Sequence, residues 1–600
     1  MDPSAPDAPF AQRRDATWFT VVGRMKPDVT VQQATADLLT LQTQLGKQFP
    51  KPDAELTVQT QTLKEVIVGD ARGSLWLLYG SVTLLLLIAC SNIAALLLAR
   101  TTEREHEISV RFSLGASRLS IVFQLLSEVF ALALFGSLAG LLIAAASARG
   151  FHLLAKTLPR AEEIGLDWRI VAYTLAAAMG TTLLCGLFPA LRGTRRSLAS
   201  TLAAGSRTQI STRGTLQWLL VGMQITLAVT LLIGAGLLLR SFQQLSRVYP
   251  GFDPSHVLTF QVSGSWGETT EMKNVIQRID RTLDSLRAMP GVEAASTAAM
   301  LPGVLSKYQL EYKIDGKLDS AHPILADTRT VSVGYFDTMR IALLAGEPCR
   351  QALNTSDVMV NRAFADKYMG NAMPVGHRLS GAVYNDFLPN GMIRGIVGDA
   401  REQGLNTQAV PTVYSCFNAP NPFPNYLVRT QGEPMAMVES IRRKIHEIEP
   451  SRSVYAFAPL QDHLDDASSE NRLRTMLLTI FASTAILLAC IGLYGTLSYL
   501  GRLRQREVGV RLALGAMRNQ IVAQFVFQGV RVATIGSAAG LALGLGMTHF
   551  IGSMLYGVST LDPVTYASVI CLMLAVAACA SLVPALRASR VEPVQVLRQE

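Results

Sequence analysis

The stretch REHEISVRFSLGASR, residues 104–118, occurs a second time as RQREVGVRLALGAMR, residues 504–518. Each copy lies between two long apolar segments. We therefore predict that each copy is a short polar piece held between membrane helices on one side of a bilayer. At a constant offset of 400 residues the copies share eight identities: Arg104/Arg504, Glu107/Glu507, Val110/Val510, Arg111/Arg511, Leu114/Leu514, Gly115/Gly515, Ala116/Ala516 and Arg118/Arg518.

Seven apolar segments are long enough to cross the hydrocarbon core of a membrane at about 1.5 Å per residue. They are residues 75–99, 120–147, 170–191, 216–239, 476–500, 520–551 and 566–586. The last three repeat the first three, with matches at 89–90/489–490, 139–141/539–541 and, after a five-residue deletion, 189–192/584–587. The sequence thus predicts an α-helical transmembrane bundle of seven helices, made of two three-helix repeats and one further helix, with a mixed α/β extracytoplasmic domain.

The composition agrees with a membrane protein. Charged residues make up 16% of the chain, whereas soluble proteins have about 25%, and the mean hydropathy is +0.28. The net charge is +9, but the basic residues gather at the ends of apolar segments, so we do not expect nucleic acid as a partner. The sequence has neither CxxC spacing nor a His/Cys cluster, so we expect no metal site and no cofactor.

The distribution of basic residues predicts the orientation of the helices. The loops 100–119, 192–215 and 500–519 and the tail 587–600 together carry 17 basic residues, whereas the opposing loops 149–169 and 552–564 carry four. This asymmetry places the duplicated stretch and the C-terminus in the cytoplasm and both soluble regions outside the inner membrane. It also places the N-terminus outside, so we expect that a preceding transmembrane helix and most of a first external domain are missing from this chain.

The domain organisation follows from these segments. We predict a disordered start (1–16), the remnant of a first external domain (17–70), a first membrane repeat (75–200), a single transmembrane helix (216–239), an external domain (240–474) and a second membrane repeat (475–600). In the remnant we expect strands at 18–25 and 56–63 and a helix opened by Thr30 with Gln33 as a capping box. In the external domain we expect strands near 257–262 and 310–314 and helices near 271–289 and 435–448. Cys349 and Cys416 face an oxidising compartment in this topology, which permits a disulfide, but the sequence gives no distance between them.

Together these motifs resemble the ABC-transporter permeases of the MacB-like and FtsX-like family. The resemblance covers roughly residues 17–600, and it makes 75–200 and 475–600 FtsX-like permease domains and 240–474 a MacB-like periplasmic core domain. The arrangement is similar to the double-length permeases of acidobacterial type, without their first helix. The residues that carry the resemblance are the duplicated stretch, the closing PALRASRVEPVQVLR at 584–598, and in the external domain 334–336, 343–346, 360–364, 374–376 and 396–399.

The resemblance implies a mechanotransmission protein without enzymatic activity of its own. In this family a separate ATPase dimer docks under the membrane, and its closure on ATP moves the periplasmic domains for export or extraction of a substrate, which the sequence does not identify. A periplasmic adaptor or an outer-membrane factor is a further partner that the family suggests. The ATPase-coupling residues are then Arg104, Glu107, Val110, Arg111, Leu114, Gly115, Arg118, Arg504, Glu507, Val510, Arg511, Leu514, Gly515 and Arg518.

The residues themselves suit docking on a partner. Each copy predicts a short amphipathic helix that exposes charges and offers two apolar side chains, such as Val110 and Leu114, to a groove. Gly115 and Gly515 are predicted to close these helices, since glycine is favoured at the position after a helix end. The repeated arginines and glutamates can also serve only as topology determinants and solvated pairs.

Other functions stay open from sequence alone. An ion-coupled secondary transporter would carry ionisable groups inside its helices; Gln124 and Gln524 recur there, but Glu128 is answered by Gln528. A membrane-anchored binding or sensory domain would need no ATPase and would leave the duplicated stretch without a purpose. An enzyme is not expected, because the sequence contains no G-x-x-x-x-G-K-[ST], H-E-x-x-H or G-x-S-x-G motif.

Overall fold

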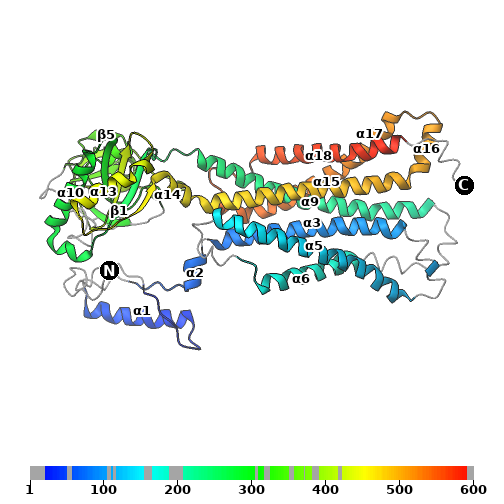
Figure 1. Ribbon diagram of the computed structural model, residues 1–600, viewed down its shortest axis with the longest axis horizontal. Helices are drawn as coiled ribbons and strands as arrows, with labels where there is room; N and C mark the ends of the chain where they lie inside the picture. The colour runs from blue at the N-terminus through cyan, green and yellow to red at the C-terminus, as the bar shows by residue number, and fades with distance from the viewer. Residues whose placement is uncertain are drawn as a thin grey trace. The chain divides into compact units, whose positions relative to one another are not determined.

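The chain folds into two compact units, one rich in β-sheet and one made of long helices (Figure 1). The sheet-rich unit comprises Met1–Gly69 and Arg247–Ser468, and the helical unit comprises Asp70–Ser246 and Ser469–Glu600. The computed structural model describes residues 21–50, 57–69, 71–103, 110–111, 117–154, 165–187, 207–304, 309–315, 324–350, 357–370, 372–381, 391–416 and 422–590.

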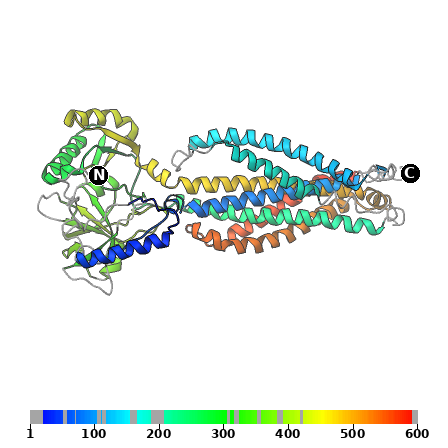
Figure 2. The same ribbon diagram turned by 90° about the horizontal axis from the view of Figure 1, so that it is seen from below.

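The helices of the helical unit run lengthwise beside one another (Figures 1 and 2). They are α3 (Ala71–Glu103), α5 (Arg118–Leu154), α6 (Trp168–Thr182) with the π-helix η2 (Leu183–Leu187), α9 (Arg207–Ser246), α15 (Ser469–Leu503), α16 (Gln505–Ala513), α17 (Arg518–Ile551) with the short η5 (Gly552–Met554), and α18 (Pro563–Ser589). Seven helices among the described residues are long and apolar enough to cross a membrane. The predicted membrane bundle with an additional α/β domain is confirmed.

The helix α9 lies at the centre of this bundle and α5 at its edge. In the span of α9 61% of the residues are buried, against 6% in the span of α5. α9 packs on α3, α15, α17 and α18, whereas α5 packs on α6 and η2. The buried face of α15 carries Ala482, Ala485 and Ala489 at helical spacing. Such small side chains let helix backbones approach closely, and this packing holds helices together where lipid removes the hydrophobic driving force.

The other unit is built on one mixed, eleven-stranded sheet in the order β11-β1-β10-β2-β4-β3-β7-β8-β6-β9, with β5 paired to β8. Most neighbours are antiparallel, while β4 runs parallel to β9 and β6 to β8. The strands are β1 (Val257–Val262), β2 (Val292–Ala298), β3 (Gln309–Ile314), β4 (Ile324–Val331), β5 (Leu343–Gly346), β6 (Asp357–Asn361), β7 (Arg378–Gly381), β8 (Gly391–Val397), β9 (Thr412–Cys416), β10 (Asn425–Thr430) and β11 (Val454–Pro459).

Two amphipathic helices, α10 (Met272–Arg287) and α13 (Val438–Ile448), cover part of this sheet. Ile279 and Leu283 of α10 and Ile441 and Ile445 of α13 are buried in one core with Phe260 of β1. Each pair is four residues apart, a spacing that places both side chains on one helix face. The remaining helices are α11 (Tyr335–Met339), α12 (Arg362–Tyr368) and α14 (Leu460–Ala467), with the 3-10 turns η3 (Trp266–Glu271) and η4 (Pro434–Met437). The two strands and two helices predicted for this region are confirmed.

The N-terminal segment corrects part of the prediction. The capping box at the start of α1 (Val31–Gln48) is present, because Gln33 N donates to the Thr30 hydroxyl at 3.3 Å and Thr30 N donates to Gln33 Oε1 at 2.9 Å. The strands predicted at 18–25 and 56–63 are wrong for the described residues: 21–25 and 57–62 belong to no strand, and the second run ends in the helix α2 (Leu63–Val68). An apolar alternation becomes a strand only beside a hydrogen-bonding neighbour, and the Thr62–Glu65 capping box starts a helix instead. The predicted disordered start, 1–16, lies outside the described residues.

A disulfide joins Cys349 to Cys416 at the end of β9, with the two Cα atoms 5.8 Å apart. Both cysteines are buried in a core that also contains Tyr335 and Phe336. The disulfide that the sequence left open is therefore part of the fold, and it closes a loop of 67 residues.

An ion-pair cluster around Glu268 ties η3 to the segment before β11. Arg452 donates two hydrogen bonds to the Glu268 carboxylate, Nη1 to Oε1 at 3.1 Å and Nη2 to Oε2 at 2.7 Å. Arg278 Nη2 lies 3.4 Å from the same carboxylate. Burial alone would raise the pKa of Glu268, but these guanidinium groups and the N–H of Ser265 hold the pKa below its ordinary value.

This cluster predicts a loss of stability in acid. Because the pKa of Glu268 is lower in the folded than in the unfolded state, its stabilisation is present above the unfolded pKa of about 4.3 and is lost as the pH falls through the folded pKa. Glu268→Gln is expected to flatten the dependence of the free energy of unfolding on pH below about 4.5. Urea titrations of the full chain at several pH values, with proteolysis of the sheet-rich unit as the readout of unfolding, measure this dependence. Glu439→Gln is the control, since its 70% exposed side chain pairs with Arg442 only at the surface. Equal slopes in both variants would refute the role of Glu268.

Candidate coupling site at the duplicated helix

The second copy of the duplicated stretch forms α16, a short helix between α15 and α17. One of its faces is seated on the bundle, because Val508 is buried and Leu512 is partly buried against the membrane core. The opposite face is exposed and carries Glu507, Val510 and Leu514. The helix is therefore amphipathic, as predicted, with one face available to a partner.

Gly515 ends α16 in a left-handed conformation, with φ of +96°. Its N–H donates to Leu512 O at 3.1 Å, and the N–H of Ala516 donates to Arg511 O at 3.0 Å. These two bonds form a Schellman motif, whose left-handed position suits glycine because glycine lacks a Cβ. The predicted capping role is confirmed for Gly515, whereas Gly115 lies outside the described residues.

Gly515→Ala is expected to weaken this turn by about 1 kcal/mol. A Cβ at residue 515 would meet no atom within 4 Å, so the penalty is conformational rather than steric. Hydrogen exchange of the Ala516 amide should accelerate about fivefold. Gly546→Ala in α17 is the control, because a Cβ there also meets no atom within 4 Å but the backbone is helical. Unchanged exchange at Ala516 in Gly515→Ala would contradict the capping role.

The same side-chain contact fixes each copy to the helix that follows it. Arg511 Nη1 donates to Gln524 Oε1 at 2.9 Å, and Arg111 Nη1 donates to Gln124 Oε1 at 2.5 Å. Arg511 Nη2 also pairs with Glu507 Oε1 at 2.6 Å, one turn earlier on α16. The recurrence of Gln124 and Gln524 is thus explained by their arginine partners, a role that sequence reasoning missed because each pair is 13 residues apart in the chain.

An apolar edge lies beside this polar contact. Val510 is 40% exposed and Leu514 is 82% exposed, and Val110 is 44% exposed in the first copy. Residues 510 and 514 are four apart and so lie on one helix face. Burying one leucine in a partner's groove stabilises a complex by about 1.5–3 kcal/mol. The arrangement can therefore bind a partner through a small apolar edge flanked by Glu507 and Arg511.

The structure describes the two predicted sets of coupling residues to different extents. In the second copy Arg504 precedes α16 and Arg518 begins α17, so all seven residues lie in or beside one helix. In the first copy Val110 and Arg111 are described, Arg118 begins α5, and the others lie outside the described residues: Arg104, Glu107, Leu114 and Gly115. Within the described ranges no group of three or more His, Cys, Asp or Glu residues could hold a metal ion.

A second contact that the sequence did not reveal lies at the opposite end of the bundle from α16. Arg240 of α9 forms an ion pair with Asp562, which also caps α18 by accepting a hydrogen bond from Thr565 N at 2.9 Å. A signal was present, since the Leu-Asp pair at 561–562 also stands at 166–167, before the third helix of the first repeat. Arginine at the end of an apolar segment is normally interpreted as a topology determinant. For this reason the sequence analysis did not pair Arg240 with Asp562.

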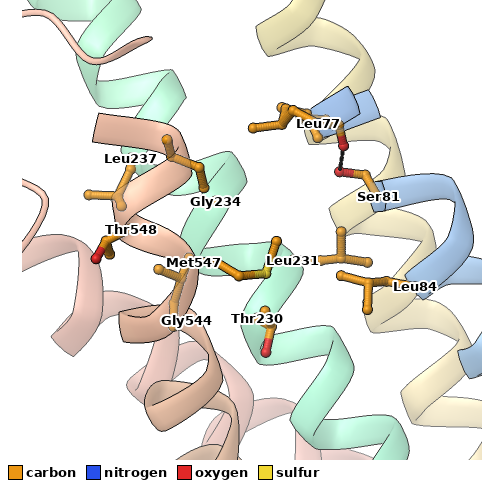
Figure 3. A pocket seen from close by; sticks show the side chains of 13 residues that line it. Leu77, Ser81, Leu84, Thr230, Leu231, Gly234, Leu237, Gly544, Met547 and Thr548 are labelled. Carbon is orange, nitrogen blue, oxygen red and sulfur yellow. Dashed lines mark hydrogen bonds between the residues drawn. The ribbon is translucent and has the colours of Figure 1, made fainter. Parts of the chain in front are cut away.

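A small apolar cavity lies where α3, α9, α15 and α17 meet (Figure 3). Ser81 of α3, Gly234 of α9 and Gly544 of α17 are among the residues that line it. Its volume of about 20 Å³ is that of roughly one water molecule. The Ser81 hydroxyl already donates to Leu77 O at 2.7 Å. We interpret the cavity as a packing gap at a four-helix junction.

Comparison with known proteins identifies the membrane repeats. The family model described as "FtsX-like permease C-terminal" matches residues 79–198 and again residues 479–593. Both matches include one copy of the duplicated stretch and the helices on either side of it.

The curated relatives include an export ATP-binding/permease protein and an ABC transporter permease. The macrolide export ATP-binding/permease protein MacB of Syntrophobacter fumaroxidans is 24% identical over 164 residues, which are 27% of this chain and only 23% of the relative's length. The uncharacterized ABC transporter permease YvrN of Bacillus subtilis is 24% identical over 287 residues, 44% of this chain and 68% of that relative. The crystal structure of the periplasmic region of MacB from Actinobacillus actinomycetemcomitans aligns with 37% of this chain and 95% of its own, with 11% identity and a TM-score of 0.24. Two regions of this chain thus match the FtsX-like permease model, and the chain is similar to MacB-like ABC transporter permeases.

Proposed function

We propose that this chain is the permease subunit of an ABC transporter and couples ATP hydrolysis by a separate ATPase to movement of its sheet-rich unit. The observation that carries the proposal is the exposed apolar edge of α16, Val510 and Leu514, whose sequence occurs twice in the chain. The MacB relative is named an ATP-binding/permease protein. This sequence contains no G-x-x-x-x-G-K-[ST] motif, and we assign the ATPase to a separate subunit.

The contacts of α16 suggest how motion passes into the bundle. A partner that binds Val510 and Leu514 would displace α16 when it moves. The Arg511–Gln524 hydrogen bond would transmit this displacement to α17. α17 packs along α9, and α9 leads in sequence directly into the sheet-rich unit at residue 247. After residue 468 the chain leaves the sheet-rich unit and continues into α15. Helix displacement at one end is thus linked covalently to the sheet-rich unit.

In this proposal α16 and the C-terminus lie in the cytoplasm and the sheet-rich unit lies outside the inner membrane. The excess of basic residues in the loops on the α16 side supports this orientation. The Cys349–Cys416 disulfide supports it independently, because disulfides persist in oxidising compartments. Two docking edges on one chain would serve the two subunits of an ATPase dimer, and the substrate is left open.

Co-purification in detergent with the ATP-binding subunits encoded by the same host tests the proposal. We expect a stable complex whose ATPase activity differs from that of the ATPase alone. A correctly inserted chain that recruits no ATPase would overturn the proposal and favour a membrane-anchored binding protein. Insertion is checked by labelling the Cys349–Cys416 pair with a membrane-impermeant maleimide after reduction.

A further inference from the structure

The interior of the sheet-rich unit contains three charged side chains that are shielded from solvent. Asp327 and Arg329 of β4 are 0% and 3% exposed, and Glu402, in the loop between β8 and β9, is 1% exposed. Arg329 Nη2 lies 2.9 Å from Asp327 Oδ2, and Arg329 Nε lies 3.8 Å from Glu402 Oε2. One guanidinium balances the charge of only one of two carboxylates, and an uncompensated charge in a protein interior is costly.

The two oxygens of the Glu402 carboxyl group have different surroundings. Tyr414 of β9 and Tyr335 of α11 donate hydrogen bonds to Oε1, at 3.0 Å and 3.3 Å. Oε2 accepts no hydrogen bond from any residue that the structure describes. Arg329 Nη2 also donates to the main-chain oxygen of Glu402 at 3.2 Å. The carboxyl group is thus held in place through Oε1, and Oε2 can carry a proton.

These surroundings favour the protonated form of Glu402. Burial is the main cause that raises the pKa of Glu402 above its ordinary value, and the Asp327 carboxylate acts in the same direction. Arg329 and the hydroxyls of Tyr414 and Tyr335 act in the opposite direction without outweighing burial. These are the charged and titratable groups that face Glu402 from β4, β9 and α11. Glu402 therefore keeps its proton at pH values at which a carboxyl group in water has lost it.

The loop between β8 and β9 also holds the chain segment that follows α9. Pro250 stands shortly after Ser246, the last residue of α9, and its carbonyl accepts a hydrogen bond from Arg401 N at 2.8 Å. A Cβ at Gly251 would lie 1.9 Å from Asp399 O, so the two backbones are in close contact. The Arg401 guanidinium donates to main-chain carbonyls of its own loop. The same loop thus carries a buried carboxyl group and fixes the start of the sheet-rich unit.

We propose that Asp327, Arg329 and Glu402 form a proton-binding site that controls how firmly the β8–β9 loop holds the segment after α9. With one proton bound, the three side chains are neutral together and can stay dry. When Glu402 releases that proton to water, the remaining net negative charge must be hydrated. Water can enter only if part of the surrounding structure opens.

The loop is the part that opens most easily. β4 is paired with β3 on one side and with β9 on the other, whereas the loop reaches the surface at Asn406 and Gln408. Opening the loop breaks the hydrogen bond between Arg401 N and Pro250 O. If the proposed coupling function holds, a rise in external pH would therefore weaken the transmission of motion from α9 into the sheet-rich unit.

Amide hydrogen exchange of the full chain in detergent, measured on peptides that cover residues 399–405, tests the site. The reference is Glu402→Gln, which keeps the shape of a protonated Glu402 but cannot ionise. The ratio of wild-type to variant exchange rates at each pH cancels the intrinsic pH dependence of exchange. Because the folded pKa of Glu402 is raised, its stabilisation is complete below the unfolded pKa of about 4.3 and is lost as the pH rises through the folded pKa. We expect the ratio to rise about tenfold per pH unit between these two pKa values and then to level off.

Two further variants make this test specific. Asp327→Asn, compared with the Asp327→Asn/Glu402→Gln double variant, should level off at a lower pH, because the neighbouring negative charge is gone. Glu439→Gln, at a side chain that is 70% exposed, should follow the wild type at every pH. A ratio that does not change with pH would overturn the proposal, and so would a levelling-off that Asp327→Asn leaves in place. The experiment needs no ATPase, so its failure is distinct from a failure of the proposed coupling function.

Discussion

Replacing Leu114 and Leu514 together by glutamate is expected to abolish recruitment of the ATPase while leaving membrane insertion intact. Leu514 is 82% exposed, so a carboxylate there is solvated in the free chain. In a complex each leucine contributes about 2 kcal/mol, and a buried carboxylate adds a desolvation penalty. Each docking contact should therefore weaken at least about thirtyfold. Co-purification and ATPase activity of the double variant measure the loss.

The control for this variant is Leu561→Glu, a leucine that is 61% exposed in the loop before α18, at the other end of the bundle. It should leave recruitment unchanged. Reversing the charges with Glu107→Lys and Glu507→Lys should weaken coupling in the same direction but less strongly, because exposed ion pairs contribute about 0–1 kcal/mol. Undiminished ATPase stimulation by the double leucine variant would contradict the coupling role of the duplicated helix.

Removing the disulfide by Cys349→Ser with Cys416→Ser is expected to lower the free energy of unfolding of the sheet-rich unit by about 4 kcal/mol. The bond closes a loop of 67 residues, and the chain-entropy relation for a loop of this length gives about that value at 25 °C. Both cysteines lie in the core that contains Tyr335 and Phe336, so partial opening of this core should follow. Proteolytic protection of the sheet-rich unit across a urea titration measures the change.

Reductant supplies an independent control for the disulfide. Wild-type chain treated with dithiothreitol should lose as much stability as the double serine variant, and the variant should not respond to reductant. Cys571→Ser, which replaces an exposed free cysteine of α18, should change nothing. A variant as stable as the oxidised wild type would show that the bond does not hold the core together.

The repeat and the seven helices could be predicted because their signals are long and consistent. Apolar length determines a spanning helix, and eight identities within fifteen residues at a constant offset are stronger than any single motif. Gly515 could be predicted for a local reason, since a left-handed helix end suits glycine whatever the tertiary surroundings. The strand β1 was predictable because its residues Val257–Val262 alternate between two clear turn signals.

The packing of the bundle could not be predicted, because hydropathy does not distinguish lipid from another helix. α5 is as apolar as α9, yet α5 lies at the edge and α9 at the centre. The strand predicted at 56–63 failed because strand pairing is non-local, whereas the Thr62–Glu65 capping box acts within four residues. Gln124 and Gln524 were noticed as polar residues in apolar segments, but their arginine partners lie 13 residues earlier in the chain, beyond the reach of a local sequence pattern.

The number of ATPase subunits bound to one chain tests the central claim most directly. Native mass spectrometry of the complex, purified in detergent with ATP present, measures that number. Two ATPase copies with a single permease chain are predicted, because one polypeptide carries both copies of the proposed docking stretch. Two ATPase copies with two permease chains, or one ATPase copy per chain, would contradict the account.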